Sequence, residues 1–183
     1  MNSSICDVQK HSFTANEKVF LDANVWLYVF GQSTPNNRKA QQYSGALQKM
    51  LVAQCSLYTD VLVMSEVINR YVRIHWKDNF SKVYQDFKVY RRSADFLPAA
   101  SGAADVVRRI LRTAKITPDG FERMNSLDLL RDFESGQYDF NDQVICRLCM
   151  CQGFTLLTDD ADFAGGPAPV LTANFSLLNS QKP

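Results

Sequence analysis

Residues 138–163 read Tyr138-Asp-Phe-Asn-Asp142-Gln-Val-Ile-Cys-Arg-Leu-Cys-Met-Cys-Gln-Gly153-Phe-Thr-Leu-Leu-Thr158-Asp-Asp160-Ala-Asp-Phe163. Asp139 or Asn141 can cap a helix here, because their side chains accept hydrogen bonds from free backbone N–H groups. Apolar residues then recur at helical spacing up to Gly153, which can take the left-handed conformation that ends a helix. The pattern predicts a helix that lies against a core.

A short strand is expected after this helix. Phe154 to Leu157 is an apolar run typical of a strand buried on both faces, and acids follow it directly. Ligand sites of open α/β sheets lie at the carboxyl ends of the strands. If the helix runs antiparallel to its strand, Asp142 at the helix start and Asp160 after the strand lie at the same end. We therefore expect these two acids to meet.

The same arrangement occurs near the start of the chain. Lys18-Val-Phe-Leu-Asp22 is a short apolar strand that ends in an acid, and Asn24 can cap the helix that follows. Further strands are expected at 56–59, 115–117 and 169–172, the last at a sheet edge. Helices are expected to begin at Ser33-Thr34-Pro35 and near residues 60, 104 and 122. This alternation predicts an α/β fold with a doubly wound parallel sheet.

Length and composition indicate one domain. With 183 residues, 46% of them hydrophobic, the chain can bury the core of one ordinary domain. We expect a polar leader at 1–17, one domain at 18–172 and a tail at 173–183. No apolar run reaches the roughly 20 residues of a membrane span, and the leader lacks the apolar middle of a secretory signal, so a cytoplasmic protein is expected. An odd number of cysteines, five, fits a reducing compartment.

Charge is unevenly distributed along the chain. Residues 75–115 hold nine lysines and arginines against four acids, a net charge of +5, whereas residues 117–163 hold three against ten, a net charge of −7. Aromatic residues alternate with the basic ones from 76 to 92, a mixture that can hold single-stranded nucleic acid, although the aromatics also form an ordinary core stripe. The candidates for phosphate contact are Lys82, Lys88, Arg91, Arg92, Arg108 and Arg112.

Four acids are candidates for one catalytic site: Asp22, Glu66, Asp142 and Asp160. Clustered carboxylates repel one another, so they persist together at neutral pH only when they share protons or cations. Their oxygens suit Mg²⁺ or Mn²⁺, which can activate a water and neutralise charge on a phosphate. Each acid also has a structural interpretation. Acids cap helices and loops, and Glu66 can pair with Arg70 four residues later.

At these residues the sequence resembles the PIN-domain family of metal-dependent nucleases, which includes the VapC-type toxin ribonucleases. The resemblance rests on four motifs, namely Val19-Phe-Leu-Asp22-Ala-Asn24, Ser65-Glu66, Asn141-Asp142-Gln-Val-Ile145 and Leu157-Thr158-Asp-Asp160-Ala-Asp162-Phe163. It covers most of the chain, and residues 78–136 exceed the family's minimal form, which implies an enlarged helical region. The implied fold is a three-layer α/β/α sandwich with a short parallel sheet.

The resemblance assigns roles to single residues. It makes Asp22, Glu66, Asp142 and Asp160 catalytic, and it makes Asp22, Asp142, Asp160 and Asp162 the metal ligands, with Asn24 and Thr158 orienting them by hydrogen bonds. Ala23 stands where family members often carry a hydroxyl residue, and Asp159 is interpreted as a variable residue. The resemblance further implies an RNA substrate, a homodimer and an antitoxin protein as partner.

Two other functions remain open from the sequence. A catalytically silent PIN-like module would hold RNA or a protein without cleaving it. A haloacid-dehalogenase-like phosphatase also places an acid after its first strand, but Asp22-Ala-Asn24 lacks that family's second aspartate, and no lysine stands shortly before Thr158. The acids therefore favour a metal-dependent endoribonuclease.

Overall fold

A computed structural model describes residues 4–31, 37–118, 120–136 and 139–180. Its centre is one sheet of six strands in the order β1-β6-β5-β2-β3-β4, and all five pairings are parallel. The strands are β1 (Ile5–Asp7), β2 (Lys18–Leu21), β3 (Ser56–Thr59), β4 (Lys115–Ile116), β5 (Thr155–Leu157) and β6 (Val170–Thr172). The expected α/β fold with a parallel sheet is confirmed.

The chain changes direction across the sheet between β2 and β5. From β2 it adds β3 and β4 on one side, and it later returns to add β5 and β6 on the other. The register places Leu21 beside Leu157, so the residues that follow these strands, Asp22 and Thr158, are neighbours. In parallel sheets such a switch point is where ligands bind, because the connecting chains diverge there.

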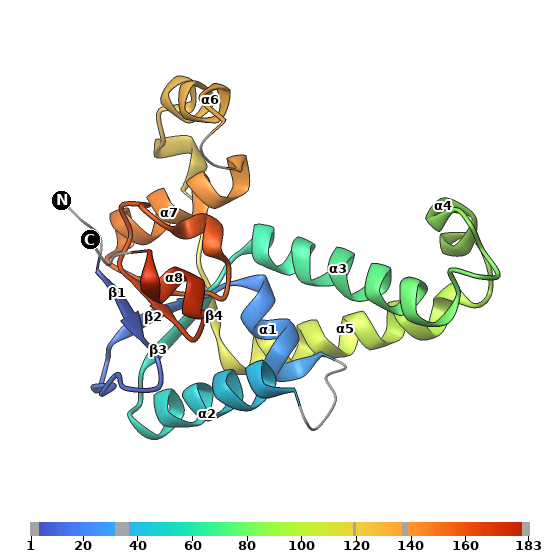
Figure 1. Cartoon of the computed structure of the whole chain (residues 1–183), viewed down its shortest axis with the longest axis horizontal. Coiled ribbons are helices and arrows are strands. Elements are labelled where there is room, and N and C mark those ends of the chain that lie inside the picture. Colours follow the sequence, from blue (N-terminus) through green and yellow to red (C-terminus); the bar gives the residue numbers. More distant parts are fainter. Residues whose placement is uncertain (1–3, 32–36, 119, 137–138, 181–183) are drawn as a thin grey trace.

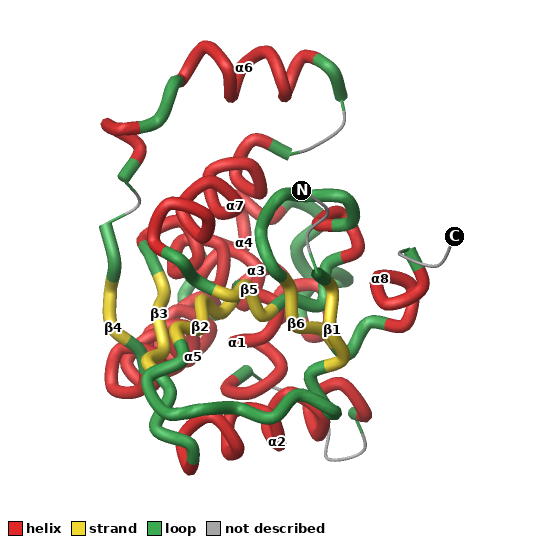
Figure 2. The backbone as a smooth tube through the Cα atoms, turned by 90° about the vertical axis from the view of Figure 1, so that its left-hand side faces the viewer, coloured by secondary structure: helices red, strands yellow, loops and turns green. Residues whose placement is uncertain are grey.

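Helices cover both faces of the sheet. Helices α1 (Ala23–Phe30) and α2 (Arg38–Val52) lie on one face, and α7 (Phe140–Gln152) lies on the other (Figure 2). Val19, Phe20 and Leu21 of β2 are fully buried between them, which is why this strand shows no alternation of polar and apolar residues. The layers therefore fix the positions of α1, which begins after Asp22, and of α7, whose first turn contains Asp142.

A long pair of helices extends away from the sheet. Helices α3 (Val61–Asn79) and α5 (Phe96–Thr113) pack along each other, and the short α4 (Phe87–Arg91) lies at their far end (Figure 1). Gly102 permits the close approach, because a side chain there would collide with the Tyr71 ring. We call residues 61–113 the helical arm.

The remaining short elements surround the C-terminal half. They are η1 (Phe121–Arg123), α6 (Ser126–Glu134), η2 (Ala161–Phe163) and α8 (Phe175–Asn179). Helix α6 packs on α7 and protrudes from the body of the molecule (Figure 1). No helix in the described part of the chain is both long and apolar enough to cross a membrane.

Several expectations about single elements differ from the structure. The expected polar leader contains β1, which takes the sheet edge, so β6 lies inside the sheet rather than at its edge. The expected tail contains α8. Helix α5 begins at Phe96 rather than near 104, because Pro98 falls in the first turn, where a helix makes no use of the backbone N–H. The expected helix start at Ser33-Thr34-Pro35 lies outside the described residues.

Candidate active site

Asp22 is a buried carboxylate at the switch point of the sheet. It follows β2 directly and caps α1, where it accepts a hydrogen bond of 2.6 Å from the Ala23 backbone N–H. Only 5% of the residue is exposed to solvent. Burial is the main reason why the pKa of Asp22 rises to about 6, and the charges of Glu66 and Asp160 raise it further.

Asn24 and Thr158 hold the Asp22 carboxylate in place. Asn24 Nδ2 and Thr158 Oγ1 both donate to Oδ2 of Asp22, at 2.6 and 2.7 Å. Asn24 also donates to Thr158 Oγ1 at 3.2 Å and accepts the Asp159 backbone N–H at 3.0 Å. These bonds tie the end of β5 to the start of α1, so the orientation of Asp22 depends on both segments.

Asp160 is the N-cap of η2 and the third residue after β5. Its backbone N–H donates to Thr158 Oγ1 at 3.0 Å, and its carboxylate accepts the Asp162 backbone N–H at 3.1 Å. Asp160 is half-buried and its charge acts on both Asp22 and Asp142, whereas Asp162 is exposed and its charge contributes to neither pKa shift. Asp160 is therefore the acid of this segment whose charge acts on the cluster.

Asp142 reaches the site from the opposite face of the sheet. It lies in the first turn of α7, one residue after Asn141, while Asp139 caps the helix by accepting the Asn141 N–H at 2.9 Å. The pKa of Asp142 rises to about 7, first through burial and then through the negative charges of Asp22, Asp139, Asp160 and Glu66. Asp142 therefore shares an electrostatic environment with the acids of three other segments.

Glu66 lies in the second turn of α3 and has two sets of neighbours. It forms an ion pair of 2.9 Å with Arg70, as the spacing of four residues suggests. Its side chain is 35% exposed, yet its charge raises the pKa of both Asp22 and Asp142. Glu66 therefore borders the cluster as well as the solvent. We call Asp22, Glu66, Asp142 and Asp160 the acid cluster.

The carboxylates of the acid cluster do not converge on a single point. Among the described residues, no group of three or more His, Cys, Asp or Glu side chains has closed to a metal-binding arrangement. The carboxylates lie within electrostatic range of one another without sharing one coordination point. Hydrogen bonds occupy both oxygens of Asp22, whereas Asp142 and Glu66 stand on helices that start at the same edge.

The six basic candidates lie away from the acid cluster. Lys82, Lys88, Arg91 and Arg92 are exposed at the far end of the helical arm, around α4 (Figure 1). Arg108 and Arg112 are exposed on α5, where Arg108 forms an ion pair with Asp105. The structure therefore does not bring these cations to the acids, and contact with a phosphate at the reacting position is excluded for the four residues near α4.

The sequence matches the family model of the PIN domain over residues 19–166. The chain belongs to the PIN domain family. PIN domains are generally nucleases that use divalent metals, so the acid cluster lies in a nuclease-type hydrolase fold. The expectation drawn from the four sequence motifs is confirmed at the level of the family. A search of curated proteins finds no match.

Solved structures that are similar to this chain include the following two. One is a chain of VapBC2 from Rickettsia felis bound to a DNA fragment from their promoter, with a TM-score of 0.54 and 14% identity over 85% of this chain and 98% of that chain. The other is PAE2754 from Pyrobaculum aerophilum, with a TM-score of 0.49 and 14% identity over 93% of this chain and 98% of that chain. At 14% identity the similarity to the VapBC2 chain supports the fold alone.

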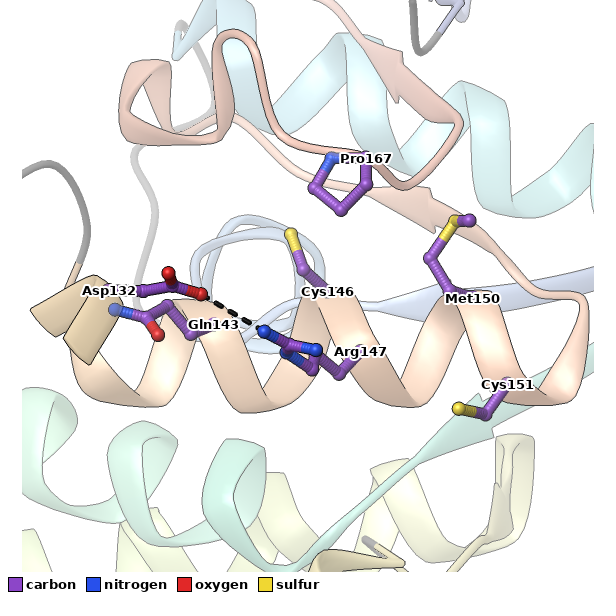
Figure 3. A pocket seen from close by; sticks show the side chains of 7 residues that line it. All are labelled: Asp132, Gln143, Cys146, Arg147, Met150, Cys151 and Pro167. Atoms are coloured by element: carbon purple, nitrogen blue, oxygen red, sulfur yellow. Dashed lines mark hydrogen bonds and ion pairs between the residues drawn. The ribbon is translucent and has the colours of Figure 1, made fainter. Parts of the chain in front are cut away.

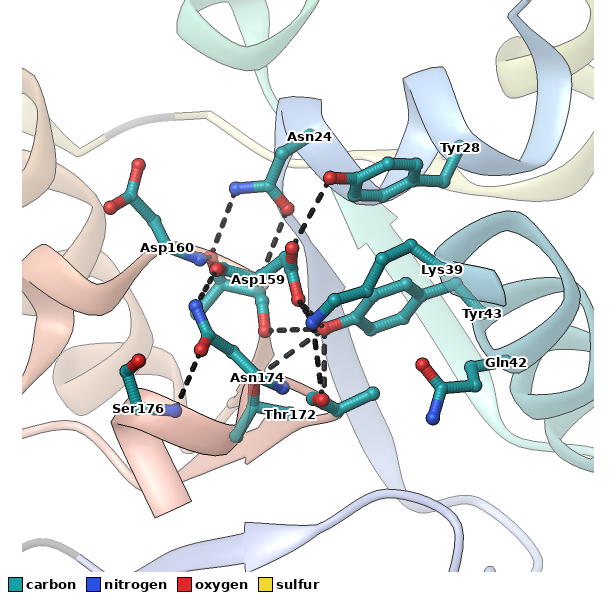
Figure 4. Close-up of polar contacts among 12 residues, drawn as sticks. Asn24, Tyr28, Lys39, Gln42, Tyr43, Asp159, Asp160, Thr172, Asn174 and Ser176 are labelled. Atoms are coloured by element: carbon teal, nitrogen blue, oxygen red, sulfur yellow. Dashed lines mark hydrogen bonds and ion pairs between the residues drawn. The ribbon is translucent and has the colours of Figure 1, made fainter. Parts of the chain in front are cut away.

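The PIN domain contains a second polar cluster that the sequence did not reveal. Asp159 is 12% exposed and accepts hydrogen bonds from Lys39 Nζ at 2.5 Å, Tyr43 Oη at 2.7 Å and Tyr28 Oη at 3.2 Å. Asp159, which the resemblance makes a variable residue, is thus held by three side chains in this structure. Figure 4 shows its carboxylate directed toward Lys39 and Tyr43, while the Asp160 carboxylate points to the other side.

This cluster fixes the segment that carries Asp160. Asn174 Nδ2 donates to the Asp159 carbonyl at 2.6 Å, and Tyr43 Oη donates to the Thr158 carbonyl at 3.2 Å. These hydrogen-bond partners come from α1, from α2 and from the segment before α8. The two partners on α2 lie more than 100 residues before Asp159 in the sequence. No local sequence pattern identifies these partners. The only signal in the sequence was the presence of one lysine and two tyrosines on α1 and α2 that could bond Asp159.

A cavity lies beside the PIN sheet but apart from the acid cluster. It has a volume of about 360 Å³ and lies between α6, α7 and the turn at Pro167 (Figure 3). Its lining includes Cys146 and Met150, and an ion pair of 3.0 Å between Asp132 and Arg147 borders it. None of the predicted site residues lines this cavity, so it takes no part in the site.

Proposed function

We propose that this PIN domain is a divalent-metal-dependent endoribonuclease that hydrolyses RNA phosphodiester bonds at the acid cluster. The observation that best supports the proposal is the electrostatic repulsion among the carboxylates of the acid cluster, which come from four separate segments of the chain. The pKa of Asp22 rises to about 6 and that of Asp142 to about 7, in both cases partly through the other acids. A fold gains no stability from this repulsion, and a cation relieves it.

The donor set fits a hard cation. Carboxylate oxygens are the ligands that Mg²⁺ and Mn²⁺ prefer, and all four members of the acid cluster are carboxylates. Asp22, Asp142 and Asp160 would hold the ion, with Asp162 as an auxiliary ligand. When bound, such an ion supplies an activated water and neutralises charge on the phosphate.

The surrounding residues orient the carboxylates and control their protons. Asn24 and Thr158 fix Asp22 through hydrogen bonds, which keeps its charged form accessible despite burial. Asp142, with a pKa near neutrality, can hold a proton until a cation displaces it. Glu66 faces both the cluster and solvent, so it can contact an RNA strand that reaches the ion.

The decisive experiment measures cleavage of single-stranded RNA by the purified chain in EDTA, Mg²⁺ and Mn²⁺. We expect cleavage only with a divalent ion, and loss of cleavage in Glu66→Gln and Asp160→Asn. Asp128→Asn is the matched control, because Asp128 is a carboxylate on α6 outside the cluster. RNA binding without cleavage under all conditions would identify a silent binding module, and hydrolysis of a small phosphomonoester that survives Glu66→Gln would identify a phosphatase.

The biological role that we propose is that of a toxin silenced by an antitoxin protein. The related fold in VapBC2 from Rickettsia felis belongs to a complex bound to promoter DNA, which motivates the partner. We also propose that the chain forms a homodimer in the cytoplasm. Light scattering measures the mass of the purified chain directly, and a monomer at micromolar concentration would contradict the dimer.

A further inference from the structure

The far end of the helical arm carries a concentrated positive charge. Residues 77–92 hold five lysines and arginines and two acids, a net charge of +3. The five cations are exposed, and none of them forms an ion pair with another described residue. We call Lys77, Lys82, Lys88, Arg91 and Arg92 the arm-tip cations.

Neither acid of this segment, Asp78 or Asp86, forms an ion pair with an arm-tip cation among the described residues. Asp86 caps α4 and accepts the Lys88 backbone N–H at 2.6 Å, so its carboxylate is held at the helix start. The arm-tip cations thus remain available to an external anion. A pair that spans one turn, such as Lys88 and Arg91, points to the same side of α4.

The aromatic residues of the arm tip are packed against one another. Tyr90 is fully buried, and the rings of Phe80 and Tyr84 lie with centroids 5.2 and 5.7 Å from its ring. Tyr90 Oη also bonds His75 Nδ1 at 2.9 Å. These rings form a small core that supports the cations, and their faces are not free for base stacking. The surface therefore suits a phosphate backbone and not the bases.

The arm tip and the acid cluster lie far apart along α3. Glu66 stands in the second turn of α3 and Asn79 is its last residue, so the tip lies roughly 20 Å beyond the cluster at about 1.5 Å per residue. Both α4 and α7 rise on the same side of α3 (Figure 1). One extended polyanion can therefore reach both regions, and roughly six base steps of about 3.4 Å span the separation.

We propose that the arm-tip cations form a second, sequence-independent docking surface for the RNA backbone, remote from the cleavage position. The inference extends the proposed function, since RNA as the bound polyanion rests on it. Without a divalent ion the acid cluster repels phosphate, whereas the arm tip attracts it. The chain should therefore hold a long RNA in the absence of metal and select substrates long enough to bridge the two regions.

The test measures the affinity of a fluorescent 30-nucleotide single-stranded RNA in EDTA, where no cleavage interferes. Replacing Lys88, Arg91 and Arg92 by glutamine should weaken binding roughly tenfold or more at low salt. It should also reduce the slope of log affinity against log salt by about 2, because three phosphate contacts are lost. Since these side chains are exposed, the variant should retain the thermal stability of the parent chain.

The matched control replaces three exposed cations elsewhere, Lys10, Lys49 and Arg123, with the same change in net charge. Twofold weakening or less is expected for the control. Equal weakening in both triple variants would show that only net charge matters and would overturn the proposal. A second outcome would also overturn the proposal. If the arm-tip variant no longer binds phosphatidylserine vesicles but binds RNA as the parent chain does, the arm tip contacts a membrane surface instead.

Cleavage kinetics provide a second measurement. With Mn²⁺ the arm-tip variant should show a higher KM for the 30-nucleotide RNA and unchanged kinetics for a trinucleotide, which is too short to reach both regions. If the chain cleaves no RNA, the proposed function fails, but the binding measurement in EDTA still decides whether the arm tip docks RNA.

Discussion

Thr158 Oγ1 donates a hydrogen bond of 2.7 Å to Asp22 Oδ2 across 136 residues of sequence. Both groups are buried, and the bond lies where β2 and β5 end side by side. It opposes the effect of burial, since donation to the charged carboxylate lowers the pKa of Asp22. The threonine thus sustains the negative charge that a cation requires.

Thr158→Val removes this donor while it keeps the shape of the side chain. We expect a loss of about 1 to 3 kcal/mol in the free energy of unfolding, because a buried carboxylate loses a partner. The pKa of Asp22 should rise further, which weakens Mn²⁺ binding near neutral pH. Urea unfolding and calorimetric titration measure the two effects. Thr158→Ser should retain both properties, and equal losses in the two variants would contradict a role for the hydroxyl.

Asp142→Asn should abolish cleavage without loss of stability. The substitution removes one charge from a repelling cluster, so the metal-free chain at pH 8 should gain up to about 1 kcal/mol, or a rise of roughly 2 to 4 °C in Tm. Differential scanning calorimetry in EDTA measures this change. A clear fall in Tm would instead show that Asp142 serves α7 mainly through the helix dipole, whose effect is about 0.3 to 1 kcal/mol.

The stability of the metal-free chain should fall as pH rises. The pKa values of Asp22 and Asp142 lie above the ordinary 3.8, at about 6 and about 7. A raised pKa means that the folded state binds the proton more tightly than the unfolded state. The stabilisation is therefore complete below about pH 4 and is lost as pH approaches 7, with about 3 kcal/mol attributable to the buried Asp22.

Urea unfolding in EDTA between pH 4 and 8 tests this dependence. Other groups also titrate, so the comparison is with Asp22→Asn, in which the fall in the unfolding free energy should be smaller. Mn²⁺ added at pH 8 should restore stability to the parent chain through binding to the folded state. Identical pH profiles for the parent and Asp22→Asn would show that Asp22 does not titrate in this range.

Lys39→Met should destabilise the chain through Asp159. It leaves a carboxylate that is 12% exposed without its cation, although Tyr28 and Tyr43 still donate to it. Because Lys39 itself is 31% exposed, we expect a loss of about 2 to 3 kcal/mol, below that of a fully buried pair. A double-mutant cycle with Asp159→Asn measures the coupling. Additive losses would mean that the ion pair contributes nothing specific.

Local patterns predicted much of the fold. The apolar run after Lys18 correctly indicated a strand, and the acid or asparagine before each helix marked α3 and α7. Local sequence patterns did not predict elements that exist only through pairing with another strand. Strand β1 is three residues long, too short to show a period, and it exists because β6 offers it hydrogen-bonding groups.

The candidate site divides in the same way. Asp22, Asp142 and Asp160 were recognisable because each lies after a strand or at the start of a helix, whereas Glu66 was recognisable only through the family resemblance. The roles of all four as catalytic groups remain a proposal. The partners of Asp159 were not recognisable, since Lys39 and Asn174 meet it only through the packing of α2 and α8.

By itself the sequence determined most of the elements, the parallel α/β class and the family, because hydrophobic period, capping residues and strand-end acids are all short-range signals. Only the tertiary structure decided which charges meet. In the folded chain four acids lie near the strand switch point, and Asp159 forms an ion pair with Lys39. The cations of residues 77–92 lie roughly 20 Å away along α3. Contacts between residues that are distant in the chain depend on how helices cross a sheet, and no local pattern encodes that geometry.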